Sequence, residues 1–313
     1  MDQLWTEKYR PKKLEDVINQ KHIVERLKAW VKAKTLPNML FAGPPGVGKT
    51  TVALCLAYEL FGEYWKENFQ ETNASDERGI DVVRGRIKEF AQIKPLGSDF
   101  KIIFLDESDA LTPEAQQALR RTMERFSGVC RFILSCNYSS RLIEPIQSRT
   151  AVFRFKELAD EHVAEYMNRI VKGEEIKVSE NGVKTIAEVS KGDLRLATNV
   201  LQATAVSGKE VSKESVYDVV SKARPEDIKD MLSFALNGKF VDARKKLYDM
   251  LIKQGLSGED IIKEIHSQVF DLDVTEEKKL KLLEHIGEFE FRLNQGGSPE
   301  IQIEALLAQF LKK

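Results

Sequence analysis

The chain contains the sequence Gly43-Pro44-Pro45-Gly46-Val47-Gly48-Lys49-Thr50, which has the spacing of a phosphate-binding loop. An apolar run, Met39-Leu-Phe-Ala42, precedes this loop, and apolar residues at helical spacing follow it. In such a loop the glycines let backbone N–H groups surround phosphate oxygens, Lys49 reaches the β- and γ-phosphates, and Thr50 holds Mg²⁺. The sequence therefore predicts a strand, a loop and a helix that bind a nucleoside triphosphate.

Four further apolar runs have the pattern of buried strands. They cover Phe69 to Asn73, Lys101 to Glu107, Arg131 to Asn137 and Ala151 to Phe155. Helical patterns separate them, so we expect an α/β fold: an open parallel sheet of five strands with helices on both faces. The ligand of such a sheet binds at the carboxyl ends of its strands.

From about Ala159 onward the apolar period is helical. Patterns over Glu161 to Lys172, Ser179 to Lys191, Leu194 to Val206 and Ser212 to Lys222 predict a small helical domain. Arg224-Pro225 marks a boundary, and five more helical patterns follow it. We therefore expect three domains, with an α/β core at 1–158, a helical domain at 159–224 and an all-helical scaffold or assembly domain at 225–313.

Composition limits the classes of function. The chain has 313 residues, with 48 basic and 49 acidic side chains and a net charge of -1, so any nucleic-acid site must be a local patch. Cys55, Cys130 and Cys136 lie in apolar surroundings without CxxC spacing, which indicates buried thiols in a reducing compartment and no zinc site. No apolar run approaches membrane-spanning length, and the sequence predicts a soluble, intracellular protein without a membrane partner.

Polar residues that end the strands are candidates for chemistry. Asp106 and Glu107 end a buried strand, where one carboxylate would orient Mg²⁺ and the other would polarise an attacking water, although a solvated turn has the same pattern. Asn137 holds the same position on another strand and would bond the γ-phosphate or the water. We expect Lys49 to face solvent and phosphate. By composition alone, Arg149 and Arg195 are typical surface charges.

Two predicted helices carry excess positive charge. The first presents Arg84 and Lys88 outward, and the second, which opens at Thr112-Pro113, presents Arg121 and Arg125 with the same spacing. Each like-charged pair costs an isolated helix about 0.2 to 0.5 kcal/mol, which indicates an anionic partner. Contact with a phosphate backbone and a solvated face fit this pattern equally well. The predicted DNA-contact set is Arg78, Arg84, Arg86, Lys88, Arg120, Arg121 and Arg125.

Several motifs together resemble a known family. They are Leu4-Trp-Thr-Glu-Lys-Tyr-Arg-Pro11, Gly43 to Thr50, Glu71-Thr-Asn-Ala-Ser-Asp-Glu-Arg-Gly-Ile-Asp-Val-Val-Arg84, Leu105-Asp-Glu-Ser-Asp-Ala-Leu-Thr112, Gln116-Gln-Ala-Leu-Arg-Arg-Thr-Met-Glu124, Ser148-Arg149 and Gly192-Asp-Leu-Arg195. Nearly the whole chain resembles the small subunit of replication factor C, a clamp loader of the AAA+ class.

The resemblance implies an architecture and an activity. It implies a P-loop AAA+ ATPase core, a helical lid and a C-terminal collar that joins one large and four small subunits into a hetero-pentamer. It also implies ATP-driven opening of the ring-shaped sliding clamp at primer-template DNA. The compact length is more typical of archaeal than of eukaryotic members, which implies the cytoplasm of an archaeal cell, or the nucleus if the source is eukaryotic.

The resemblance also implies roles for individual residues. Tyr9, Arg10 and Val17 would lie near the adenine, Asn137 and Arg195 would sense the γ-phosphate, Arg149 would be a finger inserted into the neighbouring subunit's site, and Asn73 would restrain Glu107 until DNA arrives. The catalytic set is Lys49, Asp106, Glu107, Asn137, Arg149 and Arg195, with Thr50 and Asp106 on the metal. The nucleotide-binding set is Tyr9, Arg10, Val17, Gly43, Pro44, Pro45, Gly46, Val47, Gly48, Lys49, Thr50 and Thr51.

The chain departs from the family pattern at three positions. Thr150 replaces Cys after Ser-Arg, Ser108 replaces Ala in Asp-Glu-Ala-Asp, and Asn19 replaces Gly before Gln20. None of these changes removes a catalytic group.

Three other functions fit a phosphate loop less well. Another DNA-handling AAA+ ATPase, such as a Holliday-junction motor or an origin-binding initiator, would have a winged-helix pattern after the lid. An ATP-binding structural subunit of a ring complex would not need the intact Lys49, Asp106 and Glu107. A small-molecule kinase would need an acceptor-binding pattern, which the sequence lacks.

Overall fold

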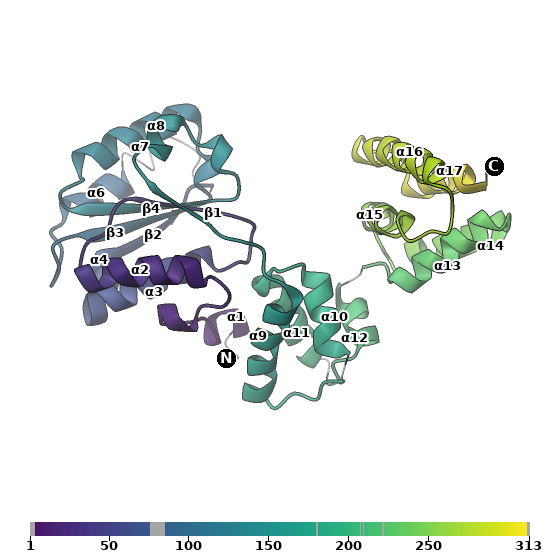
Figure 1. Ribbon diagram of the computed structural model, residues 1–313, viewed down its shortest axis with the longest axis horizontal. Helices are drawn as coiled ribbons and strands as arrows, with labels where there is room; N and C mark the ends of the chain where they lie inside the picture. The colour runs from purple at the N-terminus through teal and green to yellow at the C-terminus, as the bar shows by residue number, and fades with distance from the viewer. Residues whose placement is uncertain are drawn as a thin grey trace. The chain divides into compact units, whose positions relative to one another are not determined.

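A computed structural model of the chain describes residues 4–75, 85–179, 181–206, 208, 210–220 and 222–311. The chain forms two compact units, Met1–Val211 and Ser212–Lys313 (Figure 1). The predicted basic residues Arg78 and Arg84 lie outside the described ranges. The three-part division at 158 and 224 stays a prediction.

A parallel sheet forms the centre of the first unit. Its strands run in the order β2-β3-β4-β1-β5, and every neighbouring pair is parallel, as predicted. The strands are β1 (Met39–Ala42), β2 (Phe69–Asn73), β3 (Lys101–Asp106), β4 (Cys130–Cys136) and β5 (Ala151–Arg154). Leu40 of β1 is opposite Leu134 of β4 and Val152 of β5, so β1 lies between two partner strands. The phosphate loop therefore follows the carboxyl end of an interior strand.

Helices cover both faces of this sheet (Figure 1). Successive strand residues point to opposite faces, so Phe41 packs in the core beneath α2 (Lys21–Ala33) and α3 (Lys49–Phe61), whereas Leu40 packs in the core beneath α6 (Arg86–Gln92) and α7 (Pro113–Arg125). A sheet buried on both faces requires apolar residues at consecutive positions. This requirement explains the unbroken apolar runs of the sequence.

The first unit continues into three further helices. They are α9 (Asp160–Gly173), α10 (Gly182–Ser190) and α11 (Leu194–Val206). The N-terminal helix α1 (Trp5–Lys8) is tied to them, because Trp5 N donates to Gln202 Oε1 of α11 at 3.1 Å. Two further short helices, α4 (Trp65–Asn68) and α8 (Glu144–Gln147), connect the sheet elements.

The second unit is helical, as the sequence predicts. Its helices are α12 (Lys213–Val220), α13 (Pro225–Leu236), α14 (Phe240–Tyr248) with a π-helical continuation (Asp249–Lys253), α15 (Gly258–Val269), α16 (Glu276–Asn294) and α17 (Pro299–Leu311). The helices from α13 onward pack around an apolar core of their own. Helix α15 begins at the polar cap Ser257, whose Oγ accepts from Asp260 N at 3.0 Å. Among the described residues, no helix has both the length and the apolar character needed to span a bilayer.

The three cysteines are free and buried, as predicted. Burial raises the pKa of Cys55 and of Cys136 to about 12 and that of Cys130 to about 11. Thiols in this environment stay protonated at neutral pH and therefore contribute packing and not chemistry.

Candidate nucleotide-binding and ATPase site

The phosphate loop connects β1 to α3 through glycines in unusual conformations. Gly46 and Gly48 have φ values of 68° and 96°, in the left-handed region that side chains disfavour. A Cβ atom at Gly46 would lie 1.8 Å from Asp193 Oδ1, at the start of α11. Leu194 N also donates to Gly46 O at 3.1 Å, so the loop is packed directly against the helix that carries Arg195.

Lys49 begins α3 and is only 9% exposed. Its Nζ donates to Gly43 O at 2.7 Å, to Pro44 O at 2.8 Å and to Asn137 Oδ1 at 3.1 Å. Burial lowers the pKa of Lys49, and the nearby Asp106 carboxylate opposes this shift. The expectation that Lys49 faces solvent is therefore wrong, because the loop carbonyls and Asn137 satisfy its ammonium group inside the protein.

Thr50 and Asp106 meet at the carboxyl end of β3. Thr50 Oγ1 donates to Asp106 Oδ2 at 3.0 Å, and Asp106 Oδ1 accepts from Glu107 N at 2.9 Å. Glu107 itself has a φ of 51°, so the chain leaves the strand direction immediately after Asp106. This turn allows two consecutive carboxylates to line one pocket, which their alternation along a continued strand would prevent.

A single pocket brings most of the predicted residues together. Its walls come from the N-terminal segment, the phosphate loop, the ends of β3 and β4, and α11. The predicted residues that line it are Arg10, Val17, Pro45, Gly46, Val47, Gly48, Lys49, Thr50, Thr51, Asp106, Glu107, Asn137 and Arg195.

Three predicted nucleotide-binding residues do not line the pocket. Gly43 and Pro44 contribute to the site through their carbonyl groups, which accept from Lys49. Tyr9 points elsewhere, because its hydroxyl donates to Glu174 Oε1 at 2.8 Å. Burial and this contact with Glu174 raise the pKa of Tyr9 to about 12. The backbone of Tyr9 still supports the pocket, since its carbonyl accepts from Tyr166 Oη at 3.0 Å.

The pocket also contains residues that the sequence reasoning missed. Thr198 lies three positions after Arg195 on α11, and this helical spacing could have identified it. Cys136 directly precedes Asn137 and could have been included with it. Tyr166 carries no motif, because the packing of α9 against α10 and α11 brings it to the pocket. The other lining residues outside the predicted set are Thr6, Pro11, Ile18, Ser135 and Leu194.

Asn19 and Asn73 have distinct local roles. Asn19 has a φ of 50°, a conformation that glycine favours and asparagine tolerates, so Asn can replace the family's Gly here. The neighbouring Gln20 is buried and donates to Lys156 O at 3.0 Å. Asn73 Oδ1 accepts from Ser75 N at 3.0 Å and from Ser75 Oγ at 2.9 Å. Among the described residues no hydrogen bond joins Asn73 to Glu107, and the switch role of Asn73 stays a prediction.

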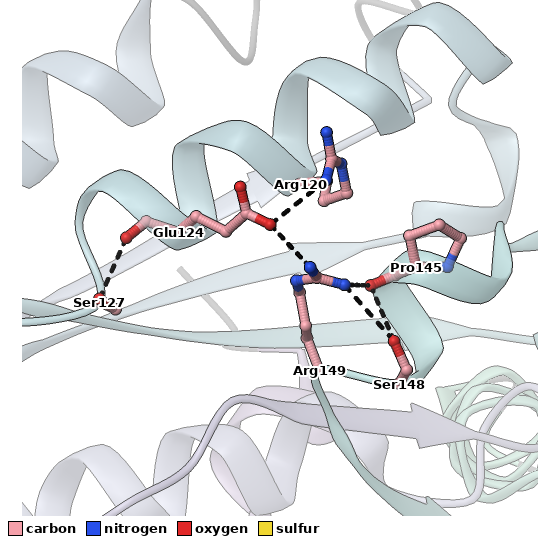
Figure 2. Close-up of polar contacts among 6 residues, drawn as sticks. All are labelled: Arg120, Glu124, Ser127, Pro145, Ser148 and Arg149. Atoms are coloured by element: carbon pink, nitrogen blue, oxygen red, sulfur yellow. Dashed lines mark hydrogen bonds and ion pairs between the residues drawn. The ribbon is translucent and has the colours of Figure 1, made fainter.

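Arg149 is absent from the residues that line the pocket. It follows α8, and its guanidinium lies between that helix and α7 (Figure 2). Nη1 donates to Pro145 O at 2.8 Å, and Nη2 forms an ion pair with Glu124 Oε1 at 2.8 Å. The side chain of Arg149 remains 39% exposed. Its own nucleotide pocket therefore forms without it.

The basic face predicted for α7 is present. Arg121 and Arg125 are exposed, as expected, whereas Arg120 is partly buried and pairs with Glu124 Oε1 at 3.3 Å. Arg86 and Lys88 of α6 are not in the buried core, and Lys88 is exposed. The structure thus places solvent-facing cations on two helices of the same sheet face, while their role toward DNA stays a prediction.

Family models match three consecutive parts of the chain. Residues 39–158 match the ATPase family associated with various cellular activities (AAA), residues 165–206 match an RCF1/5-like AAA+ ATPase lid domain, and residues 223–309 match the replication factor C C-terminal domain. Together these models include the phosphate loop, most of α9, all of α10 and α11, and nearly all of α13 to α17.

Solved structures match with lower identity. The Thermotoga maritima RuvB Holliday junction branch migration motor matches with a TM-score of 0.58 at 19% identity, over 86% of this chain and 93% of that chain. A point variant of the same motor matches with a TM-score of 0.57 at 20% identity, over 82% of this chain and 88% of that chain. This likeness supports the AAA+ fold.

Curated relatives match over nearly the full length. Replication factor C small subunits of Methanococcus vannielii and Methanocella arvoryzae are 53% and 54% identical over 99% of this chain and cover 98% and 96% of those proteins. The small subunit of Methanothermobacter thermautotrophicus is 48% identical over 98% of this chain and 97% of that protein. The chain therefore belongs to the replication factor C small-subunit family and is an ATP-hydrolysing subunit of a clamp loader.

Proposed function

We propose that this chain binds ATP with Mg²⁺ in the described pocket and, within a hetero-pentamer of one large and four small subunits, opens the sliding clamp and loads it onto primer-template DNA. One observation carries the proposal: the Thr50–Asp106 contact and the Lys49–Asn137 contact lie together at the carboxyl ends of the strands. These are the groups that bind a metal and a terminal phosphate in phosphate-loop ATPases.

Thr50 and Asp106 suit a Mg²⁺ ion shared with the substrate. The described residues include no group of three or more His, Cys, Asp or Glu side chains that could hold a metal by themselves. Mg²⁺ characteristically takes one or two carboxylates and completes its coordination with phosphate oxygens and water, so one hydroxyl and one carboxylate fit this ion. When bound, Mg²⁺ would neutralise charge on the β- and γ-phosphates.

The remaining residues of the pocket would divide the work of hydrolysis. Glu107 would polarise the attacking water, because its carboxylate lies beside the metal ligand without a metal role of its own. Lys49, Asn137 and Arg195 would contact the γ-phosphate. Arg10 and Val17 would lie beside the adenine, with Tyr9 acting through its backbone contact with Tyr166.

Arg149 would complete the site of the neighbouring subunit. Its exposure and its position outside its own pocket support action in trans. Residues 159–224 would form the lid and residues 225–313 the collar that joins the subunits. The exposed cations of α6 and α7 would contact the DNA backbone, and the chain would work in the cytoplasm of an archaeal cell.

A complementation experiment tests this function. Lys49→Ala gives a chain that cannot use ATP but keeps its finger, and Arg149→Ala gives a chain that binds ATP but lacks the finger. Each variant alone, assembled with the large subunit, should show little turnover with primed DNA and clamp. A mixture of the two should recover activity, because mixed interfaces pair an intact pocket with an intact finger.

The outcomes separate the candidate functions. A mixture that is no more active than its two components, while both variants still assemble, would exclude a finger acting in trans. Full activity of the Arg149→Ala chain would instead indicate an ATPase that needs no neighbour. ATP hydrolysis that ignores both primed DNA and clamp would exclude clamp loading.

A further inference from the structure

The side chain of Glu124 lies between two arginines (Figure 2). Its Oε1 atom is 2.8 Å from Arg149 Nη2 and 3.3 Å from Arg120 Nη1. Arg120 precedes it by one turn of α7, whereas Arg149 comes from the turn between α8 and β5, 25 residues farther along the chain. One carboxylate oxygen therefore joins the helix with the exposed cations to the turn with the finger.

Two short contacts, besides a longer one from Nη1 to Ser148 Oγ at 3.5 Å, fix the plane of the Arg149 guanidinium. Nη2 pairs with Glu124 on one helix, and Nη1 donates at 2.8 Å to the carbonyl of Pro145 on another. A guanidinium has five N–H donors in a rigid fork, and these contacts use donors of Nη1 and Nη2 only. Because the fork is rigid, these contacts also orient the donors that they do not use. The side chain of Arg149 is still 39% exposed.

An arginine on a surface turn without side-chain contacts samples many rotamers. Fixing it in one rotamer costs conformational entropy, and this cost opposes its insertion into a neighbouring site. An arginine finger places its positive charge where negative charge develops in the transition state. This stabilisation is larger when the guanidinium is already oriented before the reaction. Arg120 in turn holds Glu124, so the carboxylate is itself oriented before a neighbour arrives.

We propose that Glu124 is a positioning residue for Arg149: it orients the finger for the neighbouring subunit's nucleotide. This inference rests on the proposed function, because it requires Arg149 to act in trans. Glu124 does not touch the substrate, and its effect reaches the reaction only through the guanidinium.

The complementation mixture isolates this effect. Glu124→Ala or Glu124→Gln is introduced into the Lys49→Ala chain, which donates the finger, and this chain is mixed with the Arg149→Ala chain. We expect kcat to fall about fivefold for Glu124→Ala and about twofold for Glu124→Gln, because exposed ion pairs contribute modestly and the amide oxygen can still accept a hydrogen bond. The KM for ATP should not change, since the hydrolysing pocket belongs to the other chain.

Two controls exclude a merely structural role. Placing the same substitution in the Arg149→Ala chain should lower kcat less, because that chain has no finger to orient. Glu114→Gln, an exposed glutamate on the same helix for which the described residues show no ion pair, should leave kcat of the mixture unchanged when placed in the donating chain.

Three results would overturn the inference. They are an unchanged kcat with both Glu124 variants in the donating chain, an equal fall when the substitution is placed in either chain, and a rise in KM in place of a fall in kcat. If the mixture with native Glu124 shows no recovery at all, the proposed function fails and this inference fails with it.

Discussion

The phosphate loop and the turn that carries Arg149 (the finger turn, Ser148-Arg149) would serve one reaction under the proposed function, but they are built differently. Lys49 is 9% exposed and held by three hydrogen bonds to groups of its own site. The side chain of Arg149 is 39% exposed and is held by the Pro145 carbonyl, a surface ion pair with Glu124 and a long contact to Ser148 Oγ. The chain thus forms its pocket from internal contacts, and it leaves Arg149 exposed outside that pocket.

This difference has energetic consequences. A surface ion pair contributes about 0 to 1 kcal/mol, whereas leaving buried polar groups unpaired costs about 1 to 3 kcal/mol each. Changes in the phosphate loop should therefore alter folding and nucleotide binding of the chain that carries them. Changes in the finger turn should leave both intact and alter turnover only in the assembly.

The largest expected effect tests the finger side of the comparison. Arg149→Ala should lower turnover of the assembled complex by about 10³ to 10⁵, the range known for arginine fingers, while the isolated chain still binds ATP. Lys49→Ala should lose ATP binding in the isolated chain. Equilibrium binding of a fluorescent ATP analogue and steady-state hydrolysis separate these outcomes, and loss of binding by Arg149→Ala would place the arginine in its own pocket.

Glu107→Gln should slow hydrolysis in the pocket without preventing ATP binding. The amide is similar in size but a poor base, so kcat should fall by about 10² to 10⁴ while ATP still binds. Single-turnover measurements on the assembled complex would show the slow chemical step directly. If the variant instead loses ATP affinity, Glu107 contributes to binding and not to activation of water.

The two regions also differ in how far the sequence predicts them. The phosphate loop, the five strands and the carboxylates after Leu105 have local signatures, because loop geometry and burial on both faces restrict residue types at fixed spacings. The trans role of Arg149, in contrast, comes only from the family resemblance. From composition alone, Arg149 is a typical surface charge.

Long-range packing decides what the sequence could not show. Tyr166 reaches the pocket because α9 packs against α10 and α11, and Glu124 meets Arg149 because α7 and α8 lie together. The prediction of a solvent-facing Lys49 failed because the sequence does not show that the carbonyls of Gly43 and Pro44 turn inward and accept from its ammonium group. These contacts join segments whose separation in sequence carries no periodic signal.

Gly46→Ala should show how tightly the loop is packed against α11. A left-handed residue costs about 1 to 2 kcal/mol when glycine is replaced, and Gly48→Ala, with no atom within 4 Å of the new Cβ, measures that cost alone. Gly46→Ala adds a collision with Asp193 and should lose about 1 to 3 kcal/mol more. Urea unfolding of both variants provides the comparison, and equal losses would mean that Asp193 moves aside freely.

The smallest effect concerns the exposed cations of α7, the helix that also carries Glu124. If Arg121 and Arg125 contact phosphates, replacing both by Gln should weaken primed-DNA binding about equally for all sequences. The salt dependence should also become shallower: the magnitude of the slope of log K against log salt should fall by about 0.7 to 0.9 per lost contact.

Lys21 and Lys32 provide the matched control for this measurement. Both are exposed, and they lie on α2, which covers the opposite face of the sheet. Replacing them by Gln removes the same charge, so a general electrostatic effect would lower DNA affinity equally in both double variants. A contact at α7 would instead change the slope only for Arg121 and Arg125. Glu124 lies between Arg121 and Arg125 in the sequence of α7. A change of slope for these two arginines would therefore show that DNA contacts and the support of Arg149 lie within one turn of this helix. An unchanged slope would mean that α7 supports Arg149 but does not contact DNA through these two residues.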